Sequence, residues 1–321
     1  MKSGISISCY QYPLQFFGNK KWAFSRLSKS KQGENGRRII TSLAIVLTIS
    51  NCADIQTTQA QAKFNDVAPM EITLANPAIV KNAKPDAEGW IMKFDDKGET
   101  PWQDNWFMDG RFSKVTNTHK GLKVEAGPEA QNDAHHTVLW TKHQYDGDIK
   151  IEYDFTKIDD EIKMVNILYI QATGTGDFAQ DIATWRHQRQ VPSMKFYFER
   201  MKALHISYAA FGQTNVESEQ DYIRARVYPL HPTKGFAGMK IPPSYKETSL
   251  FKKGRTYHIT AVKTEDKLTF SVRLKNTPET KTQVFSWDLP ERGKVDTGRI
   301  GLRQMYTRSS IYNNFKIYTR E

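Results

Sequence analysis

Short runs of alternating apolar and polar residues cover the chain from Gly89 to its end. The clearest run is residues 148–155, in which every second side chain is apolar. Successive side chains of a strand point to opposite faces, so such alternation predicts strands with one buried face. Comparable runs lie at residues 90–94, 121–127, 137–141, 163–171, 194–198, 204–208, 222–228, 256–264, 267–274, 284–287, 299–304 and 312–318.

The spacing of these runs predicts the fold class. Turn signals such as Asp146-Gly147 separate them at about ten-residue intervals, and no segment after Gly89 keeps a helical apolar period beyond one turn. This pattern is typical of a β-sandwich or β-barrel, without a second domain or an internal repeat. The Pro/Gly-rich segment Leu230–Phe251 is predicted to be a surface excursion, of the kind that often rims binding sites.

The first 62 residues predict an export leader. Arg37 and Arg38 precede an apolar run at 39–49, which is shorter than the roughly 20 residues that span a bilayer. Ala60-Gln61-Ala62 then provides a small-x-small cleavage pattern. Cys52 offers the alternative of a lipid anchor. We therefore expect an exported protein, periplasmic or at the cell surface, with a leader at 1–62, an extended arm at 63–87 and one domain at 88–321.

Charge and cysteine content limit the partners. The formal net charge is +11, and the leader carries +6 of it, from eight Lys/Arg against two Asp/Glu. The remaining excess of +5 favours a locally basic cleft over a nucleic-acid surface. Both cysteines, Cys9 and Cys52, lie in the leader, so the rest of the chain has no thiolate for a metal, a disulfide or a nucleophile. We expect no cofactor and no catalytic metal, and a structural Ca²⁺ stays open.

The stretch 204–228 holds the most distinctive pattern of polar residues. His205 and Ser207 share one face of a predicted strand, and Arg224, Arg226 and Tyr228 share one face of the next. A guanidinium pairs with a carboxylate through a planar fork, so this strip suits a planar anionic ligand. The alternative is a solvated outer strand with scattered charges.

Several other residues are candidates for contact with a ligand. Trp185 could stack on a sugar ring, and Arg186 or Arg189 could pair with its carboxylate or sulfate. Only one residue of each adjacent pair on a strand can line a given site. The remaining candidates are Tyr169 with Gln171, Arg303 with Gln304, and His135 with His136.

Hydrolysis is disfavoured. Glu152-x-Asp154 resembles the carboxylate signature of sandwich glycanases, but the sequence continues Phe155-Thr156-Lys157 and lacks the final Glu. A two-carboxylate hydrolase needs both groups.

Five segments carry a resemblance to a known family. They are AHHTVLW at 134–140, DIKI at 148–151, LHISY at 204–208, GRIGLRQM at 298–305 and YNNF at 312–315. Together they resemble the YesU-like family of concanavalin-A-like jelly-roll proteins, which occur in bacterial gene clusters for acidic polysaccharides. The resemblance covers about residues 88–319 and departs at Leu230–Phe251. It implies a jelly-roll sandwich of two antiparallel sheets that acts on uronic-acid ends of oligosaccharides, notably from ulvan.

The expected activity is β-elimination on a uronate by a carbon–oxygen lyase, most simply a dehydratase that removes water from the non-reducing end. Arginines would neutralise the carboxylate: Arg224, Arg226, Arg303 or Arg189. The base would be His205, His135 or His136, and the acid Tyr208 first and Tyr228 second. Because a regular strand places His205 and Tyr208 on opposite faces, their cooperation requires a bulge. The alternatives are a chain-cleaving lyase and a non-catalytic carbohydrate-binding sandwich.

Overall fold

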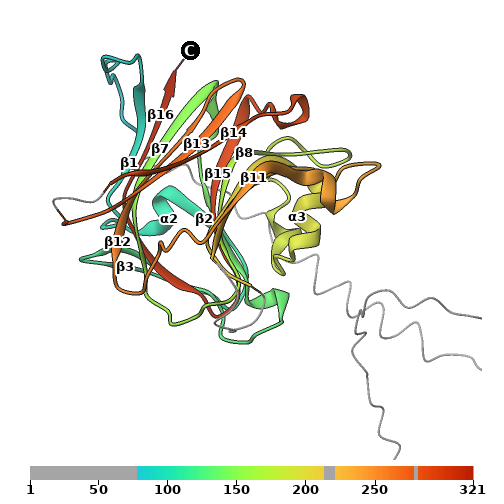
Figure 1. The fold of residues 1–321 in the computed structure, drawn as a ribbon, viewed down its shortest axis with the longest axis horizontal. Coiled ribbons are helices and arrows are strands. Elements are labelled where there is room, and N and C mark those ends of the chain that lie inside the picture. Colours follow the sequence, from blue (N-terminus) through green and yellow to red (C-terminus); the bar gives the residue numbers. More distant parts are fainter. Residues whose placement is uncertain (1–77, 213–220, 278–280, 321) are drawn as a thin grey trace, which may run out of the picture. The chain divides into compact units, whose positions relative to one another are not determined.

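The computed structural model describes residues 78–212, 221–277 and 281–320, which form two antiparallel sheets packed face to face (Figure 1). This confirms the all-β jelly-roll prediction. The predicted leader, its cleavage pattern and Cys52 lie outside the described residues, as does most of the predicted arm. The described end of that arm packs on the domain, since Ala78 is buried and Ile79 bridges to Phe94.

Sheet A has the strand order β14-β13-β12-β7-β16-β4-β3, and β1 also pairs with β16. Its strands are β1 (Ile91–Asp96), β3 (Lys114–Thr118), β4 (Gly121–Glu125), β7 (Asp148–Lys157), β12 (Thr256–Lys263), β13 (Lys267–Leu274), β14 (Gln283–Asp288) and β16 (Ser309–Arg320).

Sheet B has the strand order β11-β10-β9-β8-β15-β5-β2, and the short β6 also pairs with β15. Its strands are β2 (Trp106–Asp109), β5 (Thr137–Thr141), β6 (Tyr145–Asp146), β8 (Asn166–Gly174), β9 (Met201–Ala210), β10 (Tyr222–Tyr228), β11 (Lys240–Lys246) and β15 (Thr297–Gln304). The helices are short: α2 (Trp102–Asn105), α3 (Met194–Arg200), and the 3₁₀ turns η1 (Asp133–His135), η2 (Arg186–Arg189), η3 (Phe236–Met239) and η4 (Glu291–Gly293).

The main core lies between the two sheets. In β12 the burial alternates residue by residue, with Tyr257, Ile259 and Ala261 facing inward. Aromatic rings fill the centre, where Phe155 packs against Phe251 and Tyr312. Burying one such side chain contributes about 1.5–3 kcal/mol, so the repeated alternation fixes which face of each strand turns inward.

Two local predictions are wrong. Residues 194–198 form the start of helix α3 instead of a strand, because the Ser193 hydroxyl caps the helix by accepting a hydrogen bond from the Phe196 amide. Strand β11 lies inside the predicted surface excursion. Its two prolines, Pro242 and Pro243, argue against an inner strand, but β11 is at the edge of sheet B, where proline is tolerated.

A second hydrophobic cluster covers part of the outer face of sheet B, the face turned away from sheet A. Residues of the segment 182–197, which includes η2 and most of α3, pack on side chains from β2, β5 and β8. In Figure 1 helix α3 lies beside this sheet, next to β8 and β11. This segment encloses the polar residues described next.

Candidate functional site

The cross-strand register places two rows of side chains across the outer face of sheet B. Directly opposed residues of antiparallel strands share a face, so each row lines that face. One row is Arg226, His205, Tyr169, Gly301, Trp140 and Phe107, from β10 to β2. The neighbouring row is Arg224, Ser207, Ile167, Arg303, Val138 and Asp109.

His205 is the centre of a hydrogen-bonded chain on this face. Its Nδ1 shares a hydrogen bond with the Tyr228 hydroxyl at 2.9 Å, and its Nε2 shares one with the Ser207 hydroxyl at 2.7 Å. The Tyr169 ring meets His205 edge to face, with 5.7 Å between the ring centres. His205 is only 2% exposed and Tyr228 is fully buried, so the imidazole is held in one orientation by two partners.

Three arginines surround His205, and none forms an ion pair with a carboxylate of the described residues. Arg226 and Arg303 are 4% and 0% exposed, yet one buried Nη1 of each has no hydrogen-bond partner there. The buried Nε of Arg224 is likewise without one. Burying a cation is costly unless it is paired, so this grouping favours an anion as its missing partner. The solvent-facing margin of the group is at β10, where Tyr222 and Arg224 are half-buried.

Burial is the main cause of the pKa shifts in this group, and the arginines modify them. Burial, and then the charges of Arg226, Arg224 and Arg303, lower the pKa of His205 well below its usual value. Burial raises the pKa of Tyr228 well above 10. At neutral pH the pair is therefore a neutral imidazole and a neutral phenol. Burial and the charge of Arg224 lower the pKa of Arg226 to about 10, which leaves it cationic.

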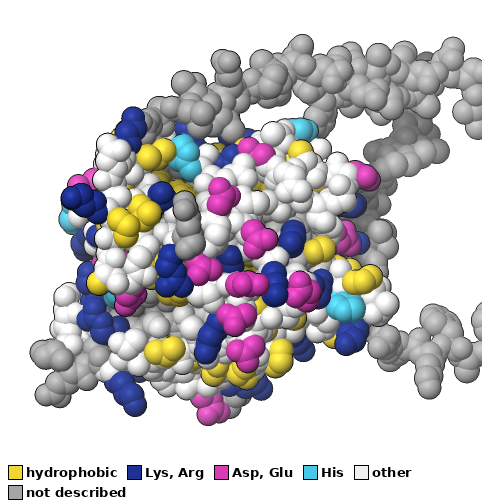
Figure 2. All heavy atoms as spheres, turned by 90° about the horizontal axis from the view of Figure 1, so that it is seen from above, with side chains coloured by type: hydrophobic (Ala, Val, Ile, Leu, Met, Phe, Trp, Pro, Cys, Tyr) yellow, Lys and Arg dark blue, Asp and Glu magenta, His cyan; other side chains and the backbone are white. Residues whose placement is uncertain are grey.

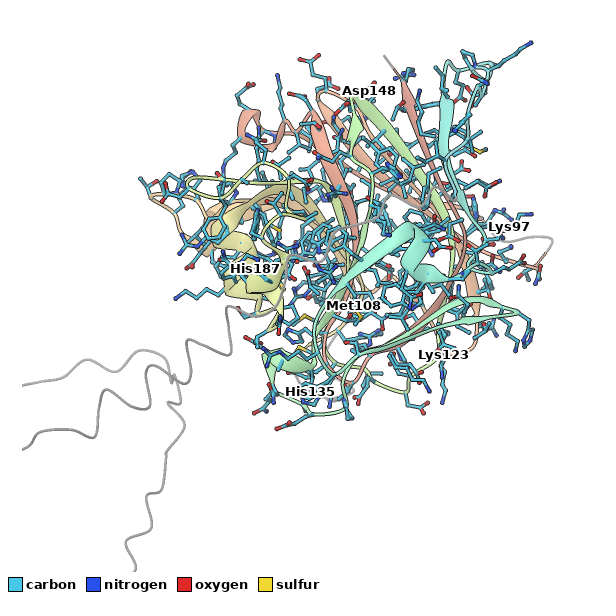
Figure 3. The ribbon with its side chains drawn as sticks, turned by 180° about the vertical axis from the view of Figure 1, so that it is seen from behind. Lys97, Met108, Lys123, His135, Asp148 and His187 are labelled. Atoms are coloured by element: carbon cyan, nitrogen blue, oxygen red, sulfur yellow. The ribbon has the colours of Figure 1, made fainter. Side chains whose placement is uncertain are left out.

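His136 positions Arg303. Arg303 Nη2 donates to His136 Nδ1 at 2.8 Å and to the carbonyl of Pro192. Burial and the charge of Arg303 lower the pKa of His136 to about 2, so the ring is neutral and its Nδ1 can accept this bond. Of the two adjacent histidines, His136 alone contacts a residue of the site. His135 belongs to η1, stacks on Phe112 and contacts Glu129, at the lower margin of the domain in Figure 3.

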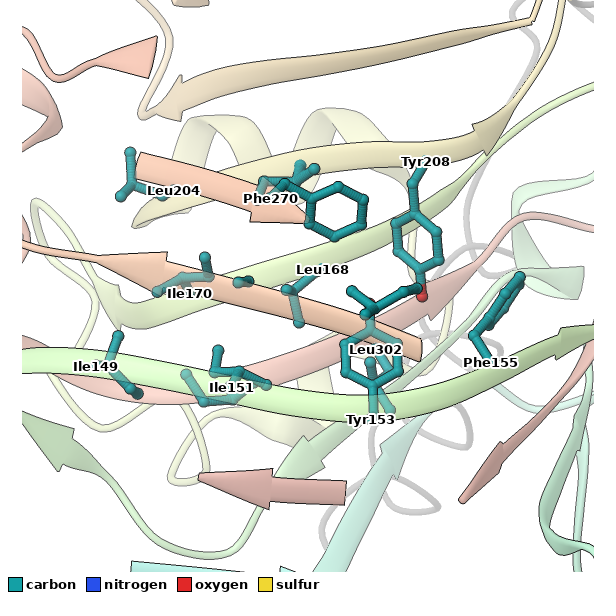
Figure 4. Close-up of a cluster of buried hydrophobic side chains, with 14 of the residues drawn as sticks. Ile149, Ile151, Tyr153, Phe155, Leu168, Ile170, Leu204, Tyr208, Phe270 and Leu302 are labelled. Carbon is teal, nitrogen blue, oxygen red and sulfur yellow. The ribbon is translucent and has the colours of Figure 1, made fainter. Parts of the chain in front are cut away.

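Tyr208 does not belong to this site. It lies in the core between the sheets, where it packs against Phe155 and Phe270 (Figure 4). No bulge intervenes between His205 and Tyr208, since residues 204–208 of β9 stay in regular register with β8. The two side chains therefore take opposite faces, as strand geometry requires. Tyr228, the second choice for the acid, is the tyrosine that contacts His205.

The structure also removes Arg189 and Trp185 from the ligand-binding candidates. Arg189 is fully buried, and its Nε forms an ion pair with Asp109 at 2.6 Å. The Trp185 ring is 4% exposed, packs against Phe178 and Phe196, and lies under the Arg189 guanidinium. Asp109 already compensates the charge of Arg189, unlike the arginines around His205, and neighbouring rings enclose Trp185.

The two glutamines have structural roles. Gln304 follows Arg303 in β15 and takes the opposite face, where its amide donates to the carbonyl of Val124 in sheet A. Gln171 lies at a register shift between β8 and β9, and its amide donates to the carbonyls of Tyr145 and Gly147. The sequence predicts that Tyr169 and Gln171 share a face of the strand, but the bulge at the register shift interrupts this alternation.

Asp109 fastens the segment 182–197, which covers part of the outer face of sheet B, and the sequence analysis did not identify this residue. One carboxylate oxygen of Asp109 accepts hydrogen bonds from Trp140 Nε1, Tyr197 OH and Arg189 Nε, at 2.7, 2.7 and 2.6 Å. These bonds tie η2 and α3 to the sheet. The Trp140 ring lies directly over Gly301, where only glycine leaves enough room. A Cβ at this position would come within 2.4 Å of the ring. A lone Asp before Gly110, in a stretch that the alternation does not predict to be a strand, gives no sequence signal for this role.

The carboxylates of Glu152-x-Asp154 are already engaged. Asp154 accepts hydrogen bonds from His258, Lys275 and Asn314, which together outweigh burial and lower its pKa to about 2. Glu152 accepts one from the Tyr318 hydroxyl. Both lie on sheet A, so they are not part of the arginine-lined face of sheet B.

Elsewhere the described surface mixes charges. Cations and anions intermingle on the face shown in Figure 2, unlike the arginine group around His205. Within residues 78–212, 221–277 and 281–320, no three His, Cys, Asp or Glu side chains come together to hold a metal ion. No helix in those ranges is long and apolar enough to cross a membrane.

The fold and this face define the class of protein: a jelly-roll β-sandwich with a buried cluster of arginine, histidine and tyrosine on one sheet. The chain belongs to the family described as "Domain of unknown function (DUF1961)", whose model matches residues 99–317. No curated protein matches it.

One solved structure supports the fold assignment. A protein of unknown function with a galectin-like fold from Bacillus subtilis is 16% identical, with a TM-score of 0.54, and the match covers 72% of this chain and 97% of that chain. Weaker likenesses include the carbohydrate-binding module CBM66 from Bacillus subtilis (12% identity, TM-score 0.38, 67% and 96% covered). Another is the lectin UEA-II complexed with galactose (7% identity, TM-score 0.45, 70% and 98% covered).

Proposed function

We propose that the outer face of sheet B binds the uronate of an acidic oligosaccharide, such as those released from ulvan. The observation that carries this proposal is the set of buried guanidinium N–H groups of Arg226 and Arg303 without partners among the described residues. A carboxylate offers two acceptor oxygens in the plane of the guanidinium and compensates its charge. Tyr228, Tyr169 and Ser207 add hydroxyl groups that suit a sugar.

Calorimetric titration with glucuronate and with glucuronate-containing oligosaccharides tests this proposal. We expect wild-type protein to bind them, and Arg226→Gln to weaken binding by about tenfold or more, the loss of one charge-assisted hydrogen bond. Arg255→Gln is the matched control, because Arg255 is exposed and immediately precedes β12 of sheet A. Equal binding by wild type and Arg226→Gln would exclude this site.

A second function, β-elimination on the bound uronate, is favoured by the contact between His205 and Tyr228. A neutral imidazole can take the C5 proton of the uronate. The electron pair then forms the C4–C5 double bond, the bond from C4 to its oxygen breaks, and Tyr228 protonates the leaving oxygen. Water leaves if that oxygen is a free hydroxyl, and a sugar leaves if it is a glycosidic oxygen. Arg226 and Arg303 would stabilise the charge that develops on the carboxylate.

Product formation distinguishes the two functions. Arg226 and Arg303 are as buried as His205 and Tyr228, so either function requires the ligand to enter past the half-buried Tyr222 and Arg224. If the protein is an enzyme, uronate oligosaccharides will gain the ultraviolet absorbance of a conjugated unsaturated uronate. His205→Asn and Tyr228→Phe should then each lose roughly 10²-fold or more in turnover, with affinity nearly unchanged. Binding without any unsaturated product would identify the protein as a non-catalytic carbohydrate-binding sandwich.

An export leader at residues 1–62 would place the protein where such oligosaccharides are released. The support is the apolar run 39–49 followed by Ala60-Gln61-Ala62. N-terminal sequencing of the exported protein tests the cleavage position, and a mature start at Met1 would contradict it.

A further inference from the structure

An exposed aromatic ring lies at the margin of the arginine group. Phe236 begins η3 and is 48% exposed, which is unusual for a phenylalanine. The Arg226 guanidinium lies over one face of its ring, with 4.1 Å between Arg226 Cζ and the ring centre. Phe198 meets the same ring at an angle of 61°. One face of Phe236 therefore covers an arginine of the site, and the exposure comes from the rest of the ring.

The loop that carries Phe236 is firmly held. His231 Nδ1 accepts from the Lys234 amide at 3.1 Å, and the Gly235 amide donates to the His231 carbonyl at 2.9 Å. Arg292 reaches across from η4 and donates to the carbonyl of Gly238 at 2.9 Å. Met239, at the end of η3, is fully buried in the cluster on sheet B. A ring on so well-anchored a loop is pre-organised, which lowers the entropic cost of binding.

We propose that Phe236 is the stacking platform for a second sugar residue, so that the ligand spans at least two residues. The C–H groups of one face of a pyranose can pack on an aromatic ring, and an exposed aromatic at a polar site suits this purpose. This inference rests on the proposed uronate site and adds the length and polarity of its ligand: an acidic residue at the arginines, joined to a residue with an apolar face at Phe236.

The geometry requires a second residue. Arg226 Cζ is 4.1 Å from one side of the Phe236 ring. A sugar stacked on the other side adds a contact distance of about 3.5–4 Å, which places it roughly 8 Å from the guanidinium. A hydrogen bond spans at most about 3.2 Å between heavy atoms. The stacked sugar is thus too far for a carboxylate in its own plane to reach Arg226, and the uronate must be its neighbour.

The test compares a one-residue and a two-residue probe. We expect Phe236→Leu to lower the affinity for a glucuronate-containing disaccharide about five- to tenfold, while the affinity for glucuronate alone stays within about twofold. Phe236→Trp keeps an aromatic face and should retain the disaccharide affinity. Val284→Ala, at another exposed apolar residue on the edge strand β14 of sheet A, is the control for a general loss of surface area.

The outcomes separate the two proposals. Equal loss for both probes in Phe236→Leu, or no loss for the disaccharide, would overturn the stacking role while leaving the uronate site intact. Failure of wild-type protein to bind either probe would overturn the uronate site itself, and the stacking role with it. Thermal unfolding of each variant shows whether η3 still packs; if Phe236→Leu unfolds early, Phe236→Tyr against Phe236→His repeats the comparison of aromatic with polar rings.

Discussion

At the scale of single residues, the most consequential finding is which neighbours share a face. The alternation of side chains along a strand places His205 and Tyr208 on opposite faces, and Arg224, Arg226 and Tyr228 on the same face. The structure confirms both assignments. The sequence could not show that Arg226 lies directly opposite His205 on the neighbouring strand, because the register between two strands depends on the turn that joins them and on the core. The hydrogen bond from Arg303 to His136 spans 167 positions of the chain and has no local signal.

The pKa of His136 leads to a prediction about pH and stability. Its folded value, about 2, lies far below the ordinary 6.5, so the unfolded chain binds more protons in the range between them. The contribution of neutral His136 to the free energy of unfolding is therefore complete above pH 6.5. Below pH 6.5 the free energy of unfolding should fall by about 1.4 kcal/mol per pH unit for this one group.

Urea unfolding at pH 7.5, 5.5 and 4.5 measures this effect. His136→Asn keeps an acceptor for Arg303 but has no ring to protonate, so its free energy of unfolding should fall less steeply with acid than that of the wild type. Parallel losses in the two proteins would contradict a neutral His136 in the folded state.

At the scale of elements, alternation of apolar residues predicts most strands and both sheets because each strand buries one face. It fails where another constraint dominates. A capping serine makes residues 194–198 helical, and an edge position lets β11 contain two prolines. The cover over sheet B was also beyond prediction, since the segment 182–197 packs through contacts with strands distant in sequence.

Asp109 provides a test of how that cover is held. Asp109→Asn removes the charge that compensates Arg189 and weakens the bonds from Tyr197 and Trp140. Breaking one partner of a buried ion pair typically costs about 3–5 kcal/mol, so we expect a lower midpoint of thermal unfolding. Asp160→Asn, which removes a highly exposed partner of Lys253, should leave the midpoint unchanged. Similar midpoints for both variants would show that α3 is held by packing alone.

At the scale of the whole molecule, a jelly-roll sandwich supplies a sheet whose outer face carries the buried arginines and His205. The β-sandwich itself does not specify a function, since many functions share it. The notable features of this chain are the grouping of Arg224, Arg226 and Arg303 around a neutral histidine, and an exposed phenylalanine at its margin. The phenylalanine, Phe236 of η3, contacts Arg226 of sheet B, so one oligosaccharide can engage both features together.

The crystal structure of the protein with a glucuronate-containing disaccharide tests the central claim most directly. We predict that a carboxylate oxygen of the sugar lies within hydrogen-bond distance of Nη1 of Arg226 or Arg303 on the outer face of sheet B. A disaccharide bound elsewhere, for example in the polar groove lined by Thr173, Lys202 and Asp296, with both Nη1 atoms away from the ligand, would contradict it.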